Sequence, residues 1–543
     1  MVFARRSTTL LAAIIASCAM VLSLTACTSD NKTVVDGQTT VTSNSAGGVA
    51  VFTPSDGITL NQQVPLNKWA KLGPALPKAL VDAGFKKGDI NHTTSDSLDK
   101  QSRAIQDFVV DHLSNNTTDD SGIAIAPDNM TLLVAPVVEA DASTRQYGDY
   151  VSQNLSTNDV TDEGATSDGE SSEDDSSKDD SSNTESDSTA SDEQAQAVDR
   201  LVSSLKLAKE SGMHVVLLGN SIEGYKPDAF VKFSDAQTIG KLQAEKMVSK
   251  LKLDKASKDN PKYIEVLLPY TAVDEKGNAN DSTFAQEAFR GIWQVLGSYY
   301  QKGVVESPSG TLDGKSTEND WQAVAYDAAK EGSTAKVLDK RLAKTDGQST
   351  LTRIDGIITM NDYIASEVVK ELDDLGYTGS AADINPQITI SGIVGNITGK
   401  KDLSRDAVPD PIKSPENDNA NDSSSSDDDA DEDTSASDKD RDSQWPLVTG
   451  YGAYVSNIPS IVNGKQWMTG MEDRQTIATD IAQACAKLNK DEALNSMPSI
   501  RNSEVGGVKK IPTISEPLLA VSASNLKSAL IDPGYISLAD AGL

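Results

Sequence analysis

Short apolar runs alternate with longer amphipathic stretches through most of this chain. Runs of roughly four to six apolar residues between turn residues are typical of buried strands, and apolar positions at three- and four-residue spacing are typical of helices. The pattern predicts strands at 49–52, 131–135, 215–218, 263–268, 354–359, 388–394 and 447–449. It predicts helices at 66–83, 97–113, 195–211, 235–251, 282–296, 323–344 with a break near Gly332, 362–375 and 475–488. This alternation indicates an α/β fold with parallel sheets, and the number of strands favours two doubly wound sheets over one.

Asparagine and aspartate recur where the predicted strands end. Ligands of open parallel sheets bind outside the carboxyl ends of the strands, so these ends define the candidate site. Asn and Asp side chains offer donors and acceptors at short reach, as a polyol ligand requires, although such residues are also ordinary helix caps and turn formers. The candidates are Asn220, Asn280, Asn361 and Asp362 after strands, and Asp235 before a helix.

Lys68 and Trp69, near the start of the first predicted helix, add a cation and an aromatic face to this set. No catalytic constellation accompanies them: the sequence has no Gly-x-Ser-x-Gly turn, no phosphate-binding glycine loop with lysine and no His-Glu-x-x-His pair. The histidines, His92, His112 and His214, are dispersed, so we expect no metal site. We therefore expect a binding protein without a cofactor, and not an enzyme.

The N-terminal stretch predicts export and membrane attachment. Two arginines precede an apolar run over 10–24, as in a secretory signal peptide, and the run is short for a membrane-spanning helix. The Leu-Thr-Ala-Cys sequence that ends at Cys27 resembles the lipobox of bacterial lipoproteins, in which the cysteine is lipidated. We expect a signal peptide over 1–26 and a lipidated tether over 27–48 that holds the protein on the extracytoplasmic side of the cell membrane. An ordinary signal peptide with a chance cysteine is the alternative.

The net charge of −32 is concentrated in two Ser/Asp/Glu-rich tracts. The stretch 156–194 carries a charge of −13 and the stretch 414–443 a charge of −10, which leaves only −9 for the rest of the chain. Both tracts lack the apolar residues that would compensate the entropy of ordering, so we expect disordered acidic insertions. A solvated loop is one interpretation of them, and weak binding of cations or wall polymers is another. No basic patch with interleaved aromatic residues is present, which argues against nucleic-acid binding.

Cysteine is sparse, with one residue in the predicted signal, one at the predicted lipidation site and Cys485. A single remaining cysteine forms no internal disulfide. Because Cys485 falls on the apolar side of a predicted helix, we expect a buried structural thiol and not a reactive one.

Several short motifs resemble bacterial type I periplasmic sugar-binding proteins, the extracytoplasmic receptors of ABC importers. Their residues are similar above all to the D-xylose- and multiple-sugar-binding branch. The similar stretches are Asn-Lys-Trp at 67–69, the Gln-containing stretch 100–106, Lys-Phe-Ser-Asp at 232–235 with 239–244, Met-Asn-Asp at 360–362, and 448–469. Together they extend over the chain from about residue 49 to 488, with the acidic tracts as insertions.

The resemblance implies two lobes joined by a three-strand hinge that close on a ligand and are then recognised by a membrane permease. The implied order is lobe 1 over 49–232, lobe 2 over 233–385, an insertion over 386–446, a return to lobe 1 over 447–466, and, over 467–543, the last hinge crossing, a lobe 2 helix and a tail. It also adds Tyr451 to the ligand-binding candidates.

Two departures from the branch concern the ligand. Gly219-Asn220 stands where the branch has an Asp-Arg pair, and Tyr451-Gly452 where it has Gln-Asp. Because charge-assisted hydrogen bonds to hydroxyl groups are lost, pentose recognition is not implied. A different sugar, a larger glycan fragment and a non-sugar ligand all stay open. The alternative function is a surface lipoprotein without a transport role that uses the fold as a sensor or cell-wall interaction module.

Overall fold

The computed structural model describes residues 32–35, 38–41, 46–55, 65–115, 125–138, 145–149, 153–156, 185–273, 279–343, 351–382 and 445–543. The chain divides into two units, 1–45 and 46–543. In the first unit, β1 (Lys32–Val35) and β2 (Gln38–Val41) form an antiparallel ladder. The predicted signal peptide, Cys27, the predicted strand at 388–394 and the acidic tract at 414–443 lie outside the described residues.

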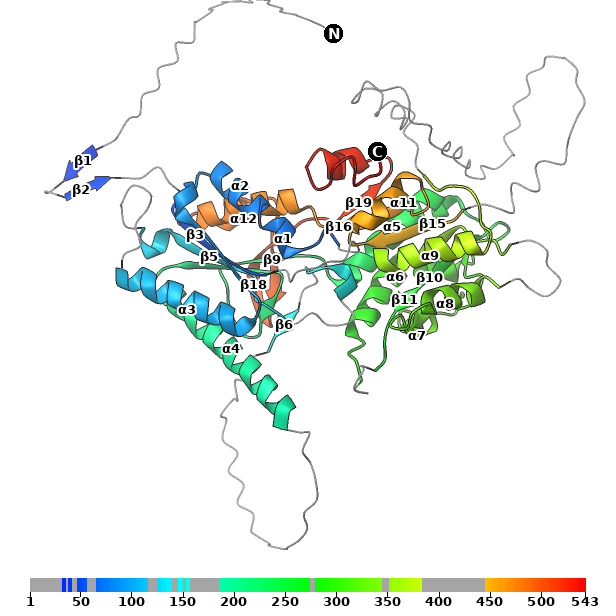
Figure 1. The fold of residues 1–543 in the computed structure, drawn as a ribbon, viewed down its shortest axis with the longest axis horizontal. Coiled ribbons are helices and arrows are strands. Elements are labelled where there is room, and N and C mark those ends of the chain that lie inside the picture. The colour runs from blue at the N-terminus through cyan, green and yellow to red at the C-terminus, as the bar shows by residue number, and fades with distance from the viewer. Residues whose placement is uncertain are drawn as a thin grey trace, which may run out of the picture. The chain divides into compact units, whose positions relative to one another are not determined.

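Within the second unit, lobe 1 is built on a seven-stranded sheet in which every neighbouring pair is parallel except β17 and β18 (Figure 1). In spatial order its strands are β17 (Ile500–Val505), β18 (Val508–Ser515), β9 (Ala229–Lys232), β7 (His214–Leu218), β5 (Met130–Val134), β3 (Gly48–Pro54) and β4 (Ile90–Ser95). The helices α2 (Ala75–Asp82) and α12 (Arg474–Leu488) cover one face, and α3 (Leu98–Asn115) and α4 (Glu185–Glu210) cover the other.

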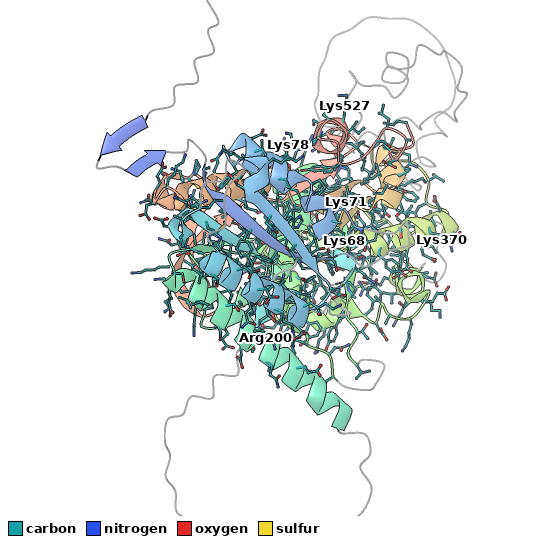
Figure 2. All side chains as sticks on the ribbon, turned by 60° about the vertical axis from the view of Figure 1, so that its left-hand side comes forward. Lys68, Lys71, Lys78, Arg200, Lys370 and Lys527 are labelled. Carbon is teal, nitrogen blue, oxygen red and sulfur yellow. The ribbon has the colours of Figure 1, made fainter. Side chains whose placement is uncertain are left out.

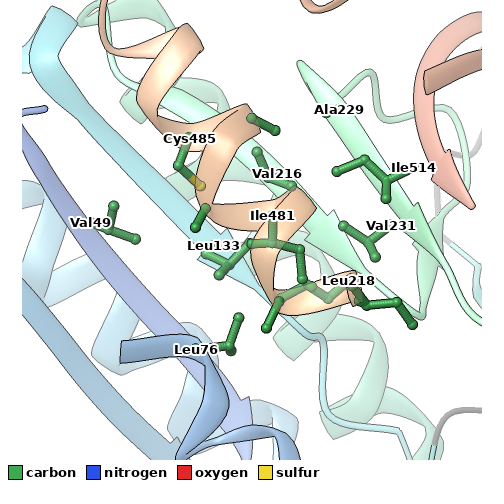
Figure 3. Close-up of a cluster of buried hydrophobic side chains, with 14 of the residues drawn as sticks. Val49, Leu76, Leu133, Val216, Leu218, Ala229, Val231, Ile481, Cys485 and Ile514 are labelled. Atoms are coloured by element: carbon green, nitrogen blue, oxygen red, sulfur yellow. The ribbon is translucent and has the colours of Figure 1, made fainter. Parts of the chain in front are cut away.

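The strands of lobe 1 bury both faces, as a sheet covered on two sides requires. Because successive side chains of a strand alternate between the faces, Val49 and Val51 pack under α2 and α12, whereas Ala50 and Phe52 pack under α3 and α4. Cys485 lies in the first of these layers, on α12 (Figure 3). Its side chain is fully buried, which confirms the prediction of a buried thiol, and burial raises the pKa of that thiol to about 12.

Lobe 2 is built on a six-stranded sheet in which only β19 runs antiparallel to its neighbour. Its strands in spatial order are β12 (Val305–Glu306), β10 (Lys262–Val266), β14 (Gly356–Ile358), β15 (Leu447–Tyr451), β16 (Met468–Met471) and β19 (Leu519–Ser522). The helices α5 (Ala236–Leu251) and α6 (Thr283–Gln301) cover one face, and α8 (Ser333–Arg341) and α9 (Asp362–Asp374) cover the other (Figure 1). The predicted class, two doubly wound α/β lobes, is confirmed.

The chain crosses between the lobes three times, from β9 to α5, from β16 to α12 and from β18 to β19. The lobe membership of the C-terminal part differs from the sequence-based expectation. The stretch 447–466 does not return to lobe 1, because β15 pairs with β14 and with β16 in lobe 2. The helix that was expected in lobe 2, α12, instead packs on α2 of lobe 1, and the β17–β18 hairpin follows it there.

Four further elements differ from those that the sequence pattern predicts. The helix expected over 66–83 is divided into α1 (Trp69–Leu72) and α2, because Pro74 has no N–H to donate. The helix expected over 323–344 with a break near Gly332 does begin again after that residue, as α8, but its first part is α7 (Trp321–Val324) and β13 (Ala325–Tyr326), because β13 pairs with β11 (Leu268–Pro269). The last part of the first acidic tract is helical, since α4 begins at Glu185. The edge strand β4 has a polar sequence without an apolar run, so the pattern missed it.

The remaining elements are short. They are β6 (Asn154–Leu155), which pairs with β8 (Ser221–Ile222), the helix α11 (Ile458–Val462), and single helical turns at Lys87–Asp89, Pro127–Asn129, Arg145–Tyr147, Leu253–Lys255, Val455–Asn457, Leu494–Ser496 and Lys527–Ile531. The C-terminal residues after β19 pack against α11. None of the helices in the described part of the chain combines the length and the apolar character that crossing a membrane requires.

The contact between α5 and α6 generates a test of the lobe 2 packing. A Cβ atom at Gly291 of α6 would overlap the backbone oxygen of Gln237 in α5. We expect Gly291→Ala to lower the free energy of unfolding by about 1–3 kcal/mol, although alanine otherwise favours a helix interior. Urea denaturation followed by circular dichroism measures this change. Gly73→Ala is the matched control, because its Cβ would meet nothing closer than 3.5 Å; equal stability of the Gly291 variant and the wild type would contradict the packing.

Candidate functional site

The carboxyl ends of the strands of both lobes meet at the hinge. Leu66, which follows β3 of lobe 1, donates its N–H to the carbonyl of Gly452, which follows β15 of lobe 2, at 2.8 Å. Two non-glycine residues after the lobe 2 strands, Met360 and Ala453, have left-handed φ values of 69° and 50°. Such backbone conformations are costly and cluster at functional sites. The edge where ligands of parallel sheets bind is therefore the interface between the two lobes.

Asp362 is a buried carboxylate on the lobe 2 side of this interface. Its Oδ1 accepts a hydrogen bond from Gln466 Nε2 at 2.7 Å. Its Oδ2 accepts from the Tyr454 N–H and from Thr469 Oγ1, each at 2.9 Å. Burial raises the pKa of Asp362 to about 6, against the opposing effect of these hydrogen bonds. The carboxylate thus joins the end of β14 to β15 and β16, and both of its oxygen atoms are engaged within the protein.

Asn361 begins α9 and faces the other lobe. Its Oδ1 caps the helix by accepting from the Ile364 N–H at 2.9 Å. Its Nδ2 donates to Oε1 of Gln146 at 3.1 Å, and Gln146 belongs to the β5–α4 connection of lobe 1. The two functions of the side chain are separate, because the oxygen holds the helix and the amide nitrogen reaches across the interface.

Tyr451 takes part in a buried network at the crossings. Its hydroxyl bonds to Ser234 Oγ and donates to Glu472 Oε1 at 3.4 Å. Glu472 Oε1 also accepts from the Ser234 N–H at 2.6 Å, so the first and second crossings are joined directly. Burial raises the pKa of Glu472 to about 7. The effect of burial is larger than the opposing effect of the hydrogen bonds, which favour the charged form. Sequence reasoning missed Ser234 and Glu472, because neither follows a recognisable strand end in the apolar pattern.

Asp235 stands next to this network but is directed to its own helix. It caps α5 by accepting from the Thr238 N–H at 2.7 Å and forms an ion pair with Lys232 at 2.8 Å. Burial opposes ionisation, but the hydrogen bonds from Lys232 and Thr238 prevail and lower the pKa of Asp235. This is the helix-cap role that the sequence analysis left open beside ligand binding.

Lys68 and Trp69 lie at the N-terminus of α1, where Figure 2 labels Lys68 and the neighbouring Lys71. Both contact Asp149: Lys68 Nζ bonds to its Oδ1 at 2.7 Å, and the Trp69 N–H donates to its Oδ2 at 3.0 Å. The Trp69 ring is buried and packs edge-on against Phe233 at 5.7 Å between centroids. The Lys68 ammonium group and the Trp69 N–H therefore hold the β5–α4 connection, whereas the Trp69 ring packs on the first crossing at Phe233.

The other two candidates make local cross-links. Asn220 Nδ2 donates to the Pro136 carbonyl at 2.9 Å, and its Oδ1 accepts from the Gln153 N–H at 3.0 Å. Asn280 Nδ2 donates to the Thr271 carbonyl at 2.8 Å. Hence Asn361, Asp362 and Tyr451 come together at the interface, whereas Asn220 and Asn280 stabilise separate connections.

One segment at the interface was not anticipated. The stretch 145–149, here called the arm, belongs to the β5–α4 connection of lobe 1, but its Tyr147 packs in the apolar cluster of lobe 2. The Tyr147 ring lies 4.6 Å from that of Phe284 and 6.3 Å from that of Tyr451, between centroids. The arm lies in a polar insertion without helical or strand periodicity, so the sequence carried no signal for it.

The histidines are separated in the structure. His92 bonds to Thr53, His112 stacks on Phe108, and His214 bonds to the Asp128 carbonyl. In the part of the chain that the structure describes, no group of three or more His, Cys, Asp or Glu side chains could hold a metal ion.

Comparison with known proteins gives a likeness of fold. No protein-family profile matches the chain, and no curated protein matches it by sequence. Among solved structures, an ABC transporter solute-binding protein from Clostridium phytofermentans with bound β-D-glucose is 17% identical, with 91% of this chain and 99% of that chain covered and a TM-score of 0.43. A carbohydrate transporter solute-binding protein from Chloroflexus aurantiacus in complex with D-glucose is 19% identical, with 92% and 98% covered and a TM-score of 0.41. A periplasmic ribose ABC transporter protein from Conexibacter woesei is 13% identical, with 90% and 98% covered and a TM-score of 0.42.

The raised pKa of Glu472 predicts a pH-dependent stability. Between the ordinary glutamate pKa of about 4.3 and about 7, the folded protein binds more protons at Glu472 than the unfolded chain does. The free energy of unfolding therefore falls as the pH rises through this window, by on the order of 3 kcal/mol from this residue. Glu472→Gln keeps an acceptor for Ser234 and removes the titration, so its stability profile is expected to be flatter between pH 5 and 7.5.

Urea denaturation at several pH values, followed by tryptophan fluorescence, measures both profiles. Glu492→Gln is the control, because Glu492 is exposed and its pKa is lowered by Lys487, so it titrates below this window. Parallel profiles for the wild type and the Glu472 variant would show that Glu472 does not titrate as its burial requires.

Proposed function

We propose that this chain is an extracytoplasmic solute-binding lipoprotein of an ABC importer that binds a sugar or a related polar small molecule between its lobes. The observation that carries the proposal is the architecture: two doubly wound lobes are joined by three crossings, and the carboxyl ends of both sheets meet at one interface. Such a hinge allows the lobes to open and close around a ligand. The motifs at 232–244 and 360–362, which resemble sugar-binding receptors, lie at the first crossing and at this interface.

Asn361 is the residue that we propose contacts the ligand directly. Its Nδ2 is directed across the interface, and its Oδ1 is already engaged by the helix. Asp362 and the Tyr451 hydroxyl are buried and act in positioning, since their polar atoms bond to protein groups of the crossings and strand ends, whereas the Tyr451 ring faces Tyr147. The ligand would be bound and released without covalent change.

The membrane attachment and the permease partner rest on the N-terminal sequence and on the motif resemblance. A lipid on Cys27 would keep the receptor next to a permease in the same membrane. Gene neighbourhood is an inexpensive test of this part: genes for an ABC ATPase and a permease next to this one support import, and a histidine kinase gene supports sensing.

A second function is favoured by one observation. The side-chain polar groups of Asn361, Asp362 and Tyr451 all have partners within the protein. An interface that is already bonded in this way suits a lipoprotein that uses the fold as a sensor or cell-wall interaction module. Ligand binding decides between the two functions.

Isothermal titration calorimetry tests the proposed function with D-glucose, D-xylose and a maltooligosaccharide as probes. We expect one of these to bind with one site per chain. Asn361→Asp keeps the helix cap and removes the amide donor, so it is expected to weaken binding about tenfold. Asn502→Asp, on the exposed face of β17, is the control with the same chemical change and no expected effect. Absence of heat with every probe at millimolar concentration would favour the second function.

A further inference from the structure

The arm forms with lobe 2 the kinds of contact that a bound ligand would form. Gln146 accepts a hydrogen bond from Asn361 Nδ2 at 3.1 Å, and its carbonyl accepts one from the Tyr454 hydroxyl at 2.8 Å. Asn361 follows β14 and Tyr454 follows β15, so both donors stand at the carboxyl ends of lobe 2 strands. Tyr147, 1% exposed, adds a ring against Phe284 and Tyr451.

The same arm is fixed to lobe 1 at its other end. Asp149 binds Lys68 Nζ and the Trp69 N–H, and its own N–H donates to the Asn67 carbonyl at 2.7 Å. Gly148 makes this geometry possible: its φ is +95°, and a Cβ there would overlap the Asn67 carbonyl oxygen. The arm thus connects the two lobes, with lobe 1 attached at Asp149 and lobe 2 at Gln146 and Tyr147.

We propose that the arm is an internal ligand: Gln146 and Tyr147 hold the lobes closed in the absence of solute, and a solute binds by displacing them. The competition with solute rests on the proposed function, whereas the closure of the lobes by the arm does not. The arm is therefore a regulatory element of the ligand site, which sets how much of the protein is open and able to bind.

The two ends of the arm differ in strength. At Asp149 a carboxylate is bound to an ammonium group and to a helix N-terminus, and such charge-assisted contacts are strong. At Tyr147 the hydroxyl is buried and has no hydrogen bond among the described residues, although the Asn361 side chain is close. A buried polar group without a partner is unfavourable, and it regains hydrogen bonds when it reaches water. Tyr147 and Gln146 can therefore withdraw while Asp149 stays attached to lobe 1.

The competition has a measurable consequence for affinity. When only a fraction of the molecules is open, the apparent dissociation constant is the intrinsic constant divided by that fraction. Weakening the arm raises the open fraction and tightens the apparent binding of solute. Strengthening the arm has the opposite effect.

Hydrogen–deuterium exchange of the full chain, without any sugar, tests the closure. The amide of Leu66 reports the closure, because it donates across the interface to Gly452.

Tyr147→Ala removes the ring of the arm, and Gln146→Ala removes the side-chain acceptor of Asn361. We expect both to speed exchange at Leu66 by about tenfold while exchange in β7 and β10 is unchanged. Tyr147→Phe removes only the buried hydroxyl, which has no hydrogen bond among the described residues, and is expected to slow exchange at Leu66. Tyr299→Ala, on the outer part of α6 where the hydroxyl bonds to Asp254, is the control.

Unchanged exchange at Leu66 in both alanine variants would overturn the proposal. If Tyr147→Ala speeds exchange in β7 and β10 as well, Gln146→Ala, which leaves the apolar cluster intact, decides the outcome.

Calorimetry with D-glucose and D-xylose then tests the competition between the arm and a solute. We expect Tyr147→Ala to bind the sugar about tenfold more tightly than the wild type does. Faster exchange at Leu66 with no sugar bound by any variant would refute the proposed function and leave the closure standing. Sugar binding of equal affinity in all variants would refute the competition.

Discussion

The lobe 2 side of the interface depends on one buried carboxylate, that of Asp362. It has no contact with solvent, and it takes three hydrogen bonds from groups on separate segments of lobe 2. The raised pKa shows that burial costs more than these bonds return. The surroundings are adapted to this arrangement, since a Cβ atom at Gly450 would overlap Oδ1 of Asp362. Through the Tyr454 N–H, Asp362 also fixes the residue whose hydroxyl binds Gln146 of the arm.

A second buried carboxylate, Glu472, has the corresponding role at the crossings. Because it accepts the N–H of Ser234, two of the three crossings are bonded to each other next to the point where the lobes would pivot. The Glu472 N–H donates in turn to Asn67, which lies beside the attached end of the arm. The acids at the hinge and the arm are thus parts of one continuous set of hydrogen bonds.

The sequence predicts those features that depend on local pattern. The limits of α5, α9 and α12 follow from their apolar spacing, and Asp235 and Asn361 were recognisable as possible caps. The membership of α12 in lobe 1 was not predictable in this way, because it depends on which helix its apolar side meets. The polar edge strand β4 has no apolar run to detect.

The same distinction applies to the candidate site. Asn361 and Asp362 were found because the end of a strand is visible in the sequence, whereas Tyr451 was added by the resemblance to sugar-binding receptors; all three lie at the strand ends that meet. Tyr147 was not found, since its partners Phe284 and Tyr451 are brought to it only by the packing of the two lobes.

The contacts of the arm define the chemistry that a competing ligand must supply. A ligand that replaces the arm has to offer hydrogen-bond acceptors to Asn361 Nδ2 and to the Tyr454 hydroxyl. It also has to offer an apolar face to the rings of Phe284 and Tyr451. A pyranose ring carries both, because its C–H face packs on aromatic rings while its hydroxyl groups accept hydrogen bonds at the edge. Its hydroxyl groups can also turn toward a partner, whereas the Tyr147 hydroxyl has no hydrogen bond within the described residues. In the proposed competition, a small ligand of this kind displaces a covalently attached residue because it satisfies the polar groups of the interface more completely.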